Sequence, residues 1–175
     1  PSGADRNPFK DQYEPRHWIE RLRKDQRVLV YLAPRTDPVL KRKLQKLYGG
    51  NGVEGSIDKA LRWLSKTQEK DGSWRVAKHG GKEEFEVGLT SLALLAFLAD
   101  GHTSGSGAHR KVVGRGLDFL LSQQKVNGLI GSDQGNYLYN HAIAGIALFE
   151  AWLMTGAEKL EAPASSAVAF TVAAQ

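Results

Sequence analysis

The sequence predicts an all-α protein made of repeated helical hairpins. Two kinds of segment support this prediction: one with apolar residues on a single helical face, and one that is apolar on nearly every side. The first face consists of Ile57, Ala60, Leu61 and Leu64, spaced i, i+3, i+4 and i+7. The second segment runs from Gly88 to Gly101, and a helix of this kind needs cover on most sides. We therefore expect an outer helix followed by an inner helix.

The pair of segments recurs along the chain. An offset of 56 converts Ile57, Ala60, Leu61, Trp63, Leu64, Gln68 and Gly72 into Val113, Gly116, Leu117, Phe119, Leu120, Gln124 and Gly128. A further offset of 51 leads to Ala164, Ala167, Val168, Phe170, Thr171 and Gln175. Repetition of this kind indicates a helical array, because a single hairpin cannot bury its own apolar face.

Residues 1–55 form a basic leader before the array. The first 56 residues hold 12 of the 24 Lys and Arg side chains and only 7 acids, so the net charge of +5 arises entirely in this part. Basic leaders attract phosphate, and an anionic membrane surface is one such partner. Nucleic acid is disfavoured as a partner, because acidic residues are interleaved with the basic ones and the leader has few aromatic residues that could stack on bases. A solvated helical linker packed on the array is the favoured alternative.

Two helices are expected within the leader. The first begins at Pro15, continues to Leu32 and ends before Pro34. The second has Asp37 as its N-cap and Pro38 at its first position. Its apolar face consists of Leu40, Leu44 and Leu47. The helix is expected to end at Gly49-Gly50.

Residues 56–175 form the array, with no sheet. Outer helices are expected over Ile57–Gln68, over Arg110–Gln124 and from Ala164 onward. Inner helices are expected over Val87–Ala99 and His141–Met154, so the chain holds about two and a half hairpins.

The array resembles a known superfamily at its turns. The spacing aromatic-x4-Gln-x3-Gly-x-Trp, seen at Trp63, Gln68, Gly72 and Trp74, is similar to the Gln-Trp repeat of the terpenoid cyclase and protein prenyltransferase superfamily, which includes squalene-hopene cyclases. The resemblance implies an α/α toroid of inner and outer helices, of which this chain is a part. It also implies that the Gln caps a neighbouring helix end, that the Trp covers that end, and that together they tie one hairpin to the next.

The second copy of the repeat departs from this spacing, and the enzymes' catalytic residues are absent. Leu129 and Ile130 stand where the first copy has Ser73 and Trp74. Cyclases of the squalene-hopene type protonate an alkene with an acid in an Asp-x-Asp-Asp run, which is missing here. Prenyltransferases of this fold bind zinc partly through Cys, and the chain has no Cys. We therefore expect no cofactor, no metal and no catalytic residue in this segment.

The densest polar cluster lies at the start of the second inner segment. In toroids of the resembled superfamily such residues face the central cavity, which makes Asp133, Tyr137, Tyr139 and His141 candidates for a ligand-facing rim. In the alternative interpretation Asn140 caps the helix, His141 hydrogen-bonds locally and the tyrosines pack between hairpins.

A second polar loop and the apolar runs indicate neither a metal site nor a membrane span. His79 is followed by Glu83, Glu84 and Glu86, but these spacings match no zinc or calcium motif, so we expect a surface loop. The longest apolar run, residues 92–99, is too short to span a membrane.

The sequence indicates a piece of a longer chain whose compartment is unknown. It begins with Pro1, its only Met is Met154, and the third copy stops at Gln175. Further repeats of the same chain would then cover an apolar face of the inner helices. The predicted function is a non-catalytic binding or scaffold module, with a hydrophobic or isoprenoid-like ligand as one partner. The alternative is an enzyme of this superfamily whose catalytic residues lie beyond Gln175.

Overall fold

The computed structural model describes residue 21 and residues 24–48 and 52–174. Within these ranges the chain forms seven α-helices, two 3-10 helices and no strand, and one isolated bridge pairs Gln124 with Ile130. None of these described helices is long and apolar enough to cross a bilayer. The predicted all-α class is confirmed.

The leader contains two helices, α2 (Gln26–Thr36) and α3 (Pro38–Leu47). α3 begins as predicted, because the Asp37 carboxylate accepts hydrogen bonds from two amides of the first turn and Pro38 takes the first position. The expected stop at Gly49-Gly50 lies outside the described residues.

The predicted helix is interrupted at Asp25 and ends later than expected. Asp25 adopts extended backbone and caps a new helix with its carboxylate, so α2 starts there; the expected start at Pro15 lies outside the described residues. The predicted end before Pro34 is wrong, since Pro34 lies inside the last turn. Proline removes only one helical hydrogen bond at that position. Arg35 follows it and pairs with Glu150 at 2.6 Å, which holds this last turn against the array.

Five helices form the array: α4 (Glu54–Thr67), α5 (Glu86–Ala99), α6 (Arg110–Ser122), α7 (Tyr137–Thr155) and α8 (Glu158–Ala173). The short 3-10 helices η2 (Val76–His79) and η3 (Glu83–Phe85) lie between α4 and α5. The predicted bounds of α4, α5 and α6 agree with these to within about three residues, the usual uncertainty of helix ends.

The last two helices begin earlier than predicted. α7 starts at Tyr137, four residues before His141. α8 starts six residues before the predicted Ala164, because acids in its first turn suit the positive end of the helix dipole and Leu160 is fully buried. Pro163 therefore lies within α8, where it removes one helical hydrogen bond.

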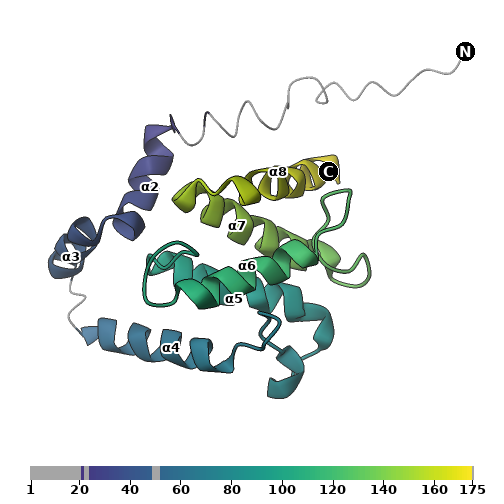
Figure 1. Ribbon diagram of the computed structural model, residues 1–175, viewed down its shortest axis with the longest axis horizontal. Coiled ribbons are helices and arrows are strands. Elements are labelled where there is room, and N and C mark those ends of the chain that lie inside the picture. The colour runs from purple at the N-terminus through teal and green to yellow at the C-terminus, as the bar shows by residue number, and fades with distance from the viewer. Residues whose placement is uncertain (1–20, 22–23, 49–51, 175) are drawn as a thin grey trace, which may run out of the picture.

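The two inner helices pack side by side at the centre of the array. α5 contacts α7 most extensively, α6 packs against α5, and α8 packs against α7. Figure 1 shows this order, with α4 at one side of the stack and α8 at the other. The large buried side chains of the core include Phe97, Leu98, Leu117, Leu120, Leu148 and Trp152. Burying each contributes about 1.5–3 kcal/mol relative to exposure, so the contact between inner and outer helices stabilises the fold.

α4 is less covered than its apolar face predicts. Leu61 is buried and Leu64 is half-buried, but Ile57 is 38% exposed and Ala60 is exposed as well. Of the other helices, α4 packs mainly on α5, so only a narrow part of its apolar face is covered.

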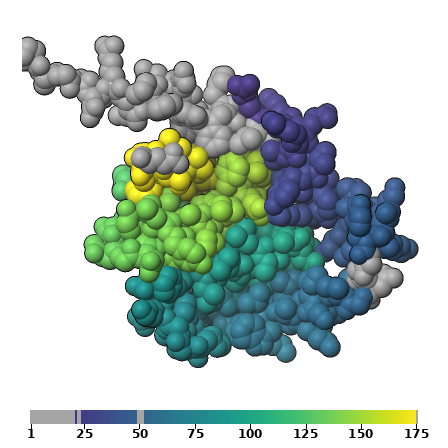
Figure 2. All heavy atoms as spheres, turned by 180° about the vertical axis from the view of Figure 1, so that it is seen from behind, coloured from purple at the N-terminus to yellow at the C-terminus, as the bar shows by residue number. Residues whose placement is uncertain are grey.

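The leader helices lie along one side of the array, as Figures 1 and 2 show. Two ion pairs hold them: Arg35 to Glu150 on α7 at 2.6 Å, and Lys41 to Asp100 after α5 at 2.5 Å. Both pairs are largely shielded from solvent, which makes them stronger than a typical surface ion pair.

Candidate functional site

Gln68 connects the turn after α4 to the next outer helix. Its Nε2 donates hydrogen bonds to the main-chain carbonyls of Gly72 at 3.0 Å and Val112 at 2.9 Å. Its Oε1 accepts from the guanidinium of Arg115 at 2.6 Å. Because Val112 is the third residue of α6, the bond reaches the first turn of the neighbouring outer helix.

Gln124 makes the equivalent contacts one hairpin later. Its Nε2 donates to the carbonyls of Gly128 at 3.3 Å and Pro163 at 2.9 Å, the latter in the first half of α8. The turns also share main-chain bonds, from Glu69 N to Ser73 O at 2.9 Å and from Lys125 N to Leu129 O at 2.7 Å. The two turns therefore have the same hydrogen-bond pattern, although the second lacks the Trp.

Both turns need glycine at the same position. Gly72 and Gly128 have φ of +94° and +91°, a region that residues with a Cβ rarely adopt. A Cβ at Gly72 would lie 2.1 Å from the carbonyl oxygen of Arg115, and one at Gly128 would lie 2.2 Å from that of Ser166. Glycine thus allows each turn to abut the next outer helix.

Trp74 packs within its own hairpin. It is 4% exposed, its Nε1 donates to the Leu64 carbonyl near the end of α4 at 2.8 Å, and its ring lies 6.1 Å from that of Phe97. Its amide donates to Thr90 Oγ1 at 3.0 Å. The contacts of Gln68 cross to the next hairpin, whereas those of Trp74 join α4 to α5.

The remaining repeat positions differ in burial. Phe119 is buried, and Phe170 is half-buried with its ring 4.7 Å from that of His141. Trp63 is exposed, with its ring 5.8 Å from that of His79. Gln175 lies outside the described residues. Of these three aromatic residues, only Phe119 is therefore part of the core.

His141 lies inside the protein and links three segments. Its Nδ1 accepts from the Ile130 amide at 3.1 Å, and its Nε2 is 3.1 Å from both the Ala167 carbonyl and the Thr171 hydroxyl. Since Nδ1 accepts, the neutral ring carries its proton on Nε2, where the Ala167 carbonyl can accept it. Burial lowers the pKa of His141 below its ordinary value of 6.5. These contacts favour the alternative interpretation, in which His141 is structural.

Asn140 caps the neighbouring inner helix. Its Oδ1 accepts from the amide of Gly88 in the first turn of α5 at 3.1 Å, and its Nδ2 donates to the Glu84 carbonyl at 2.7 Å. α7 itself begins at Tyr137 without a side-chain cap. The prediction that Asn140 caps its own helix is therefore wrong, because its side chain joins the two inner helices.

Asp133 and Tyr137 lie apart from the hollows described next. The Asp133 carboxylate is exposed and 3.1 Å from the Lys125 amine, whose hydrogen bond lowers the pKa of Asp133 below its ordinary value. Tyr137 is half-buried as the first residue of α7.

Tyr139 is the rim candidate that borders an apolar hollow. The hollow has a volume of about 410 Å³, and its lining includes Phe85 and Tyr139, whose rings meet edge to face at 6.2 Å. A second hollow of about 380 Å³ lies between α4 and α5 beside Trp63. Both are lined by Leu89 and Leu92, so they adjoin on the exposed side of α5. We call the two hollows together the α5 groove.

The two charged residues Glu69 and Arg75 line the α5 groove and are paired with other residues. Glu69 forms an ion pair with Lys78, and Arg75 pairs with Asp71 at 3.2 Å. Glu69 is the only acid that lines either hollow in the described part of the chain. Nor do the described residues contain a group of three side chains placed to hold a metal ion. An apolar floor with a few polar groups is typical of a small-molecule binding site.

Comparison of the chain with protein-family models, with curated proteins and with solved structures found no match. The function is therefore inferred from the residues of the chain and their contacts.

The sequence does not single out the leucines of the α5 groove. In a segment that is apolar on all sides, periodicity cannot separate an exposed Leu89 or Leu92 from a core leucine. One signal is present in Trp63, which lies between Arg62 and Lys66 on the charged side of α4. In the structure this residue lines the second hollow, together with Leu89 and Leu92.

Proposed function

We propose that this chain is part of an α/α toroid of the terpenoid cyclase and protein prenyltransferase superfamily and serves as a non-catalytic binding module for a hydrophobic, isoprenoid-like ligand. The α5 groove carries the proposal: hollows of about 410 and 380 Å³ share Leu89 and Leu92 on an inner helix. Volumes of roughly 300–1,000 Å³ are usual for small-molecule sites.

The packing of the helices supports the toroid part of the proposal. The inner helices α5 and α7 pack together, and each has a later outer helix against it. Gln68 and Gln124 form equivalent bonds to successive outer helices. A fixed relation between neighbouring hairpins is what a curved helical array requires, because each hairpin is stabilised mainly by its neighbours.

The lining of the α5 groove supports an apolar, unsaturated ligand. Leu89 and Leu92 form its floor, and the rings of Trp63, Phe85 and Tyr139 line its sides. Apolar contact stabilises a bound hydrocarbon by about 0.8 kcal/mol for each buried methylene. Ring faces also provide large rigid contact surfaces for the flat double bonds of an isoprenoid chain.

The acids near the groove support binding rather than alkene protonation. Protonating so weak a base needs a positioned carboxylic acid that holds its proton. Glu69 lines one hollow but is ion-paired with Lys78, and Asp133 is exposed, paired with Lys125 and lines neither hollow.

A titration with farnesol, followed by tryptophan fluorescence, tests the proposal. The chain should bind farnesol saturably, and Leu92→Glu should weaken binding roughly tenfold or more, because a charge on the groove floor is costly to desolvate. Ala99→Glu is the matched control, since Ala99 is exposed on the same helix outside both hollows. Circular dichroism checks that both variants fold. Non-saturable partitioning of farnesol, or equal weakening by both variants, would reject the α5 groove as the site.

A further inference from the structure

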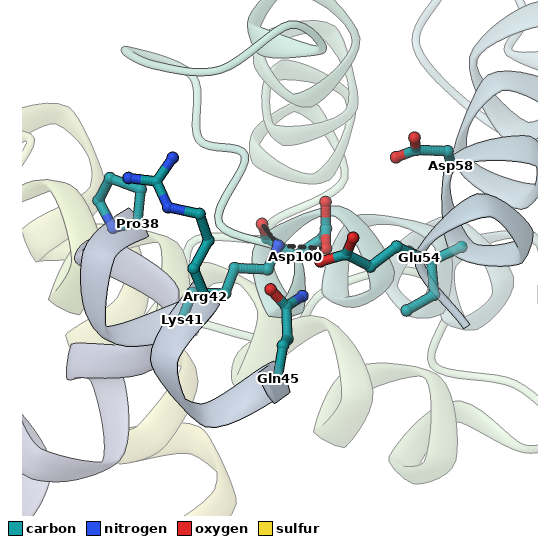
Figure 3. A pocket seen from close by; sticks show the side chains of 8 residues that line it. Pro38, Lys41, Arg42, Gln45, Glu54, Asp58 and Asp100 are labelled. Atoms are coloured by element: carbon teal, nitrogen blue, oxygen red, sulfur yellow. Dashed lines mark hydrogen bonds and ion pairs between the residues drawn. The ribbon is translucent and has the colours of Figure 1, made fainter. Parts of the chain in front are cut away.

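One face of α3 is fixed against the array. Lys41 donates to the Asp100 carboxylate at 2.5 Å and to the Asp100 carbonyl at 2.8 Å, a contact that Figure 3 shows from close by. Leu40 and Leu44 are half-buried on this same side. The opposite face of α3 is therefore held outward in a defined orientation.

The outward face of α3 carries cations and apolar side chains together. Arg42, Lys43 and Lys46 are exposed, and within the described residues they have no ion-pair partner. Val39 lies between Lys43 and Lys46 on the helix surface, and Leu47 lies beside Lys43 at the edge of this face, next to Leu40. Val39 and Leu47 are each 65% exposed. We call these five residues the α3 face. In the view from behind, α3 lies at the outer edge of the molecule (Figure 2).

The α3 face contains no acid, and neither does the rest of α3. Asp37 caps the first turn of α3, and Asp100 is paired with Lys41 on the side that faces the array. Glu54 and Asp58, at the start of α4, line the same hollow of about 290 Å³ as Arg42 (Figure 3). They reduce the contribution of Arg42 to an outward positive potential. Lys43 and Lys46 do not line this hollow, and they are the cations best placed to meet an anionic partner.

We propose that the α3 face docks the protein on an anionic membrane surface, where lipid headgroups meet Lys43 and Lys46 while Val39 and Leu47 enter the interface. Helices that lie in the plane of a bilayer combine basic and apolar residues in this way. The proposal does not depend on the α5 groove, because the two surfaces share no residue.

The exposed apolar side chains favour a membrane over nucleic acid. A duplex backbone attracts Lys43 and Lys46 equally well, but it offers little apolar contact for Val39 and Leu47. Tyr48 follows α3 and is 81% exposed, and tyrosine is suited to the boundary between headgroups and acyl chains. A bilayer interface can accommodate both kinds of side chain, so it complements the whole face.

Another basic surface of the array provides a matched control. Lys59 and Lys66 are exposed on α4, and exchanging them for Gln changes the net charge as much as exchanging Lys43 and Lys46. α4 also contains Glu54 and Asp58, which oppose its positive potential, so we do not assign docking to it.

Vesicle sedimentation of the full chain tests the proposal with two lipid compositions. The chain should bind vesicles containing phosphatidylglycerol, bind pure phosphatidylcholine vesicles far less, and release when salt is raised. Lys43→Gln with Lys46→Gln should lower partitioning onto anionic vesicles roughly 25-fold, since each basic residue contributes about fivefold. Lys59→Gln with Lys66→Gln should change it less than about twofold if α4 does not face the membrane.

A third variant separates the apolar part from the charged part. Leu47→Asn should weaken binding to anionic vesicles by roughly fivefold or more without changing its salt dependence, because it removes an exposed aliphatic side chain. Circular dichroism confirms that each variant folds. Equal effects of the two lysine pairs, equal binding to both lipids, or no effect of Leu47→Asn would overturn the proposal. It would also fail if the chain bound a DNA or RNA duplex more tightly than anionic vesicles, with Lys43 and Lys46 responsible.

Discussion

Gln68 donates a hydrogen bond from Nε2 to the main-chain carbonyl of Val112, 2.9 Å away, and so connects the turn after α4 to α6. Gln124 makes the corresponding bond to Pro163 in α8 at 2.9 Å. A shielded side-chain amide that bonds two carbonyls is hard to replace, because its loss leaves those acceptors with fewer donors. These two residues join successive hairpins, so variants at either position measure the strength of that connection.

Gln124→Ala should therefore lower the free energy of unfolding by about 1–3 kcal/mol. The adjacent Gln123 is a matched control, because its side chain bonds only the neighbouring Ser122 hydroxyl, at 3.2 Å. Gln123→Ala should cost less than about 0.5 kcal/mol. Urea unfolding of both variants makes the comparison, and equal losses would show that the bond to Pro163 does not join the hairpins.

Trp74→Ala should cost about 3–5 kcal/mol, because it removes a buried ring and its bond to the Leu64 carbonyl. Trp63→Phe should cost less than about 1 kcal/mol, since Trp63 is exposed and the later copies already use Phe at this position. Thermal melts compare the two. Similar small losses would mean that Trp74 is not part of the core.

Gly128→Ala should destabilise the protein through two effects. The positive φ costs about 1–2 kcal/mol for a residue with a Cβ, and the approach of 2.2 Å to the Ser166 carbonyl adds about 1–3 kcal/mol. Gly80→Ala is the control, because Gly80 also has positive φ but no atom within 4 Å of an added Cβ. If chemical denaturation gives the same loss for both, the close contact between turn and outer helix does not exist in solution.

Stability should fall as the pH decreases below about 6.5, the ordinary pKa of histidine. Burial lowers the pKa of folded His141, so between that pKa and about 6.5 the unfolded chain binds more protons than the folded chain. His102 adds to the same dependence, because burial also lowers its pKa.

The variant His141→Gln should reduce the slope of stability against pH in that window, whatever its effect on absolute stability. The free energy of unfolding, measured by urea titration at several pH values, gives the slopes. An unchanged slope in His141→Gln would contradict a buried, neutral His141.

The sequence predicts the helices well where repetition and periodicity agree. α4, α5 and α6 lie close to their predicted bounds, because the spacing of Gln68 and Gln124 fixes where each outer helix must stop. The early start of α8 is not predictable from local signals, since Pro163 reads as a helix start. Tertiary burial of Leu160 decides it instead.

The candidate site is only partly predictable. Asp133, Tyr137, Tyr139 and His141 lie within nine residues of one another, but Asp133 precedes α7 and the helix directs the other three side chains to different faces. Only Tyr139 borders the α5 groove. His141 is directed inward to α8. The groove itself depends on which side of α5 stays uncovered, and that follows from packing between helices that one segment's sequence does not encode.

The claim that the α5 groove binds an isoprenoid-like ligand is tested most directly by photolabelling. A farnesyl analogue carrying a diazirine on its chain would be irradiated with the protein, and the labelled residues would be located by peptide mass spectrometry. We predict labels within residues 85–96 and at Tyr139, with competition by unlabelled farnesol. Labels confined to α3 or spread over the surface, or labels that farnesol does not displace, would contradict the account.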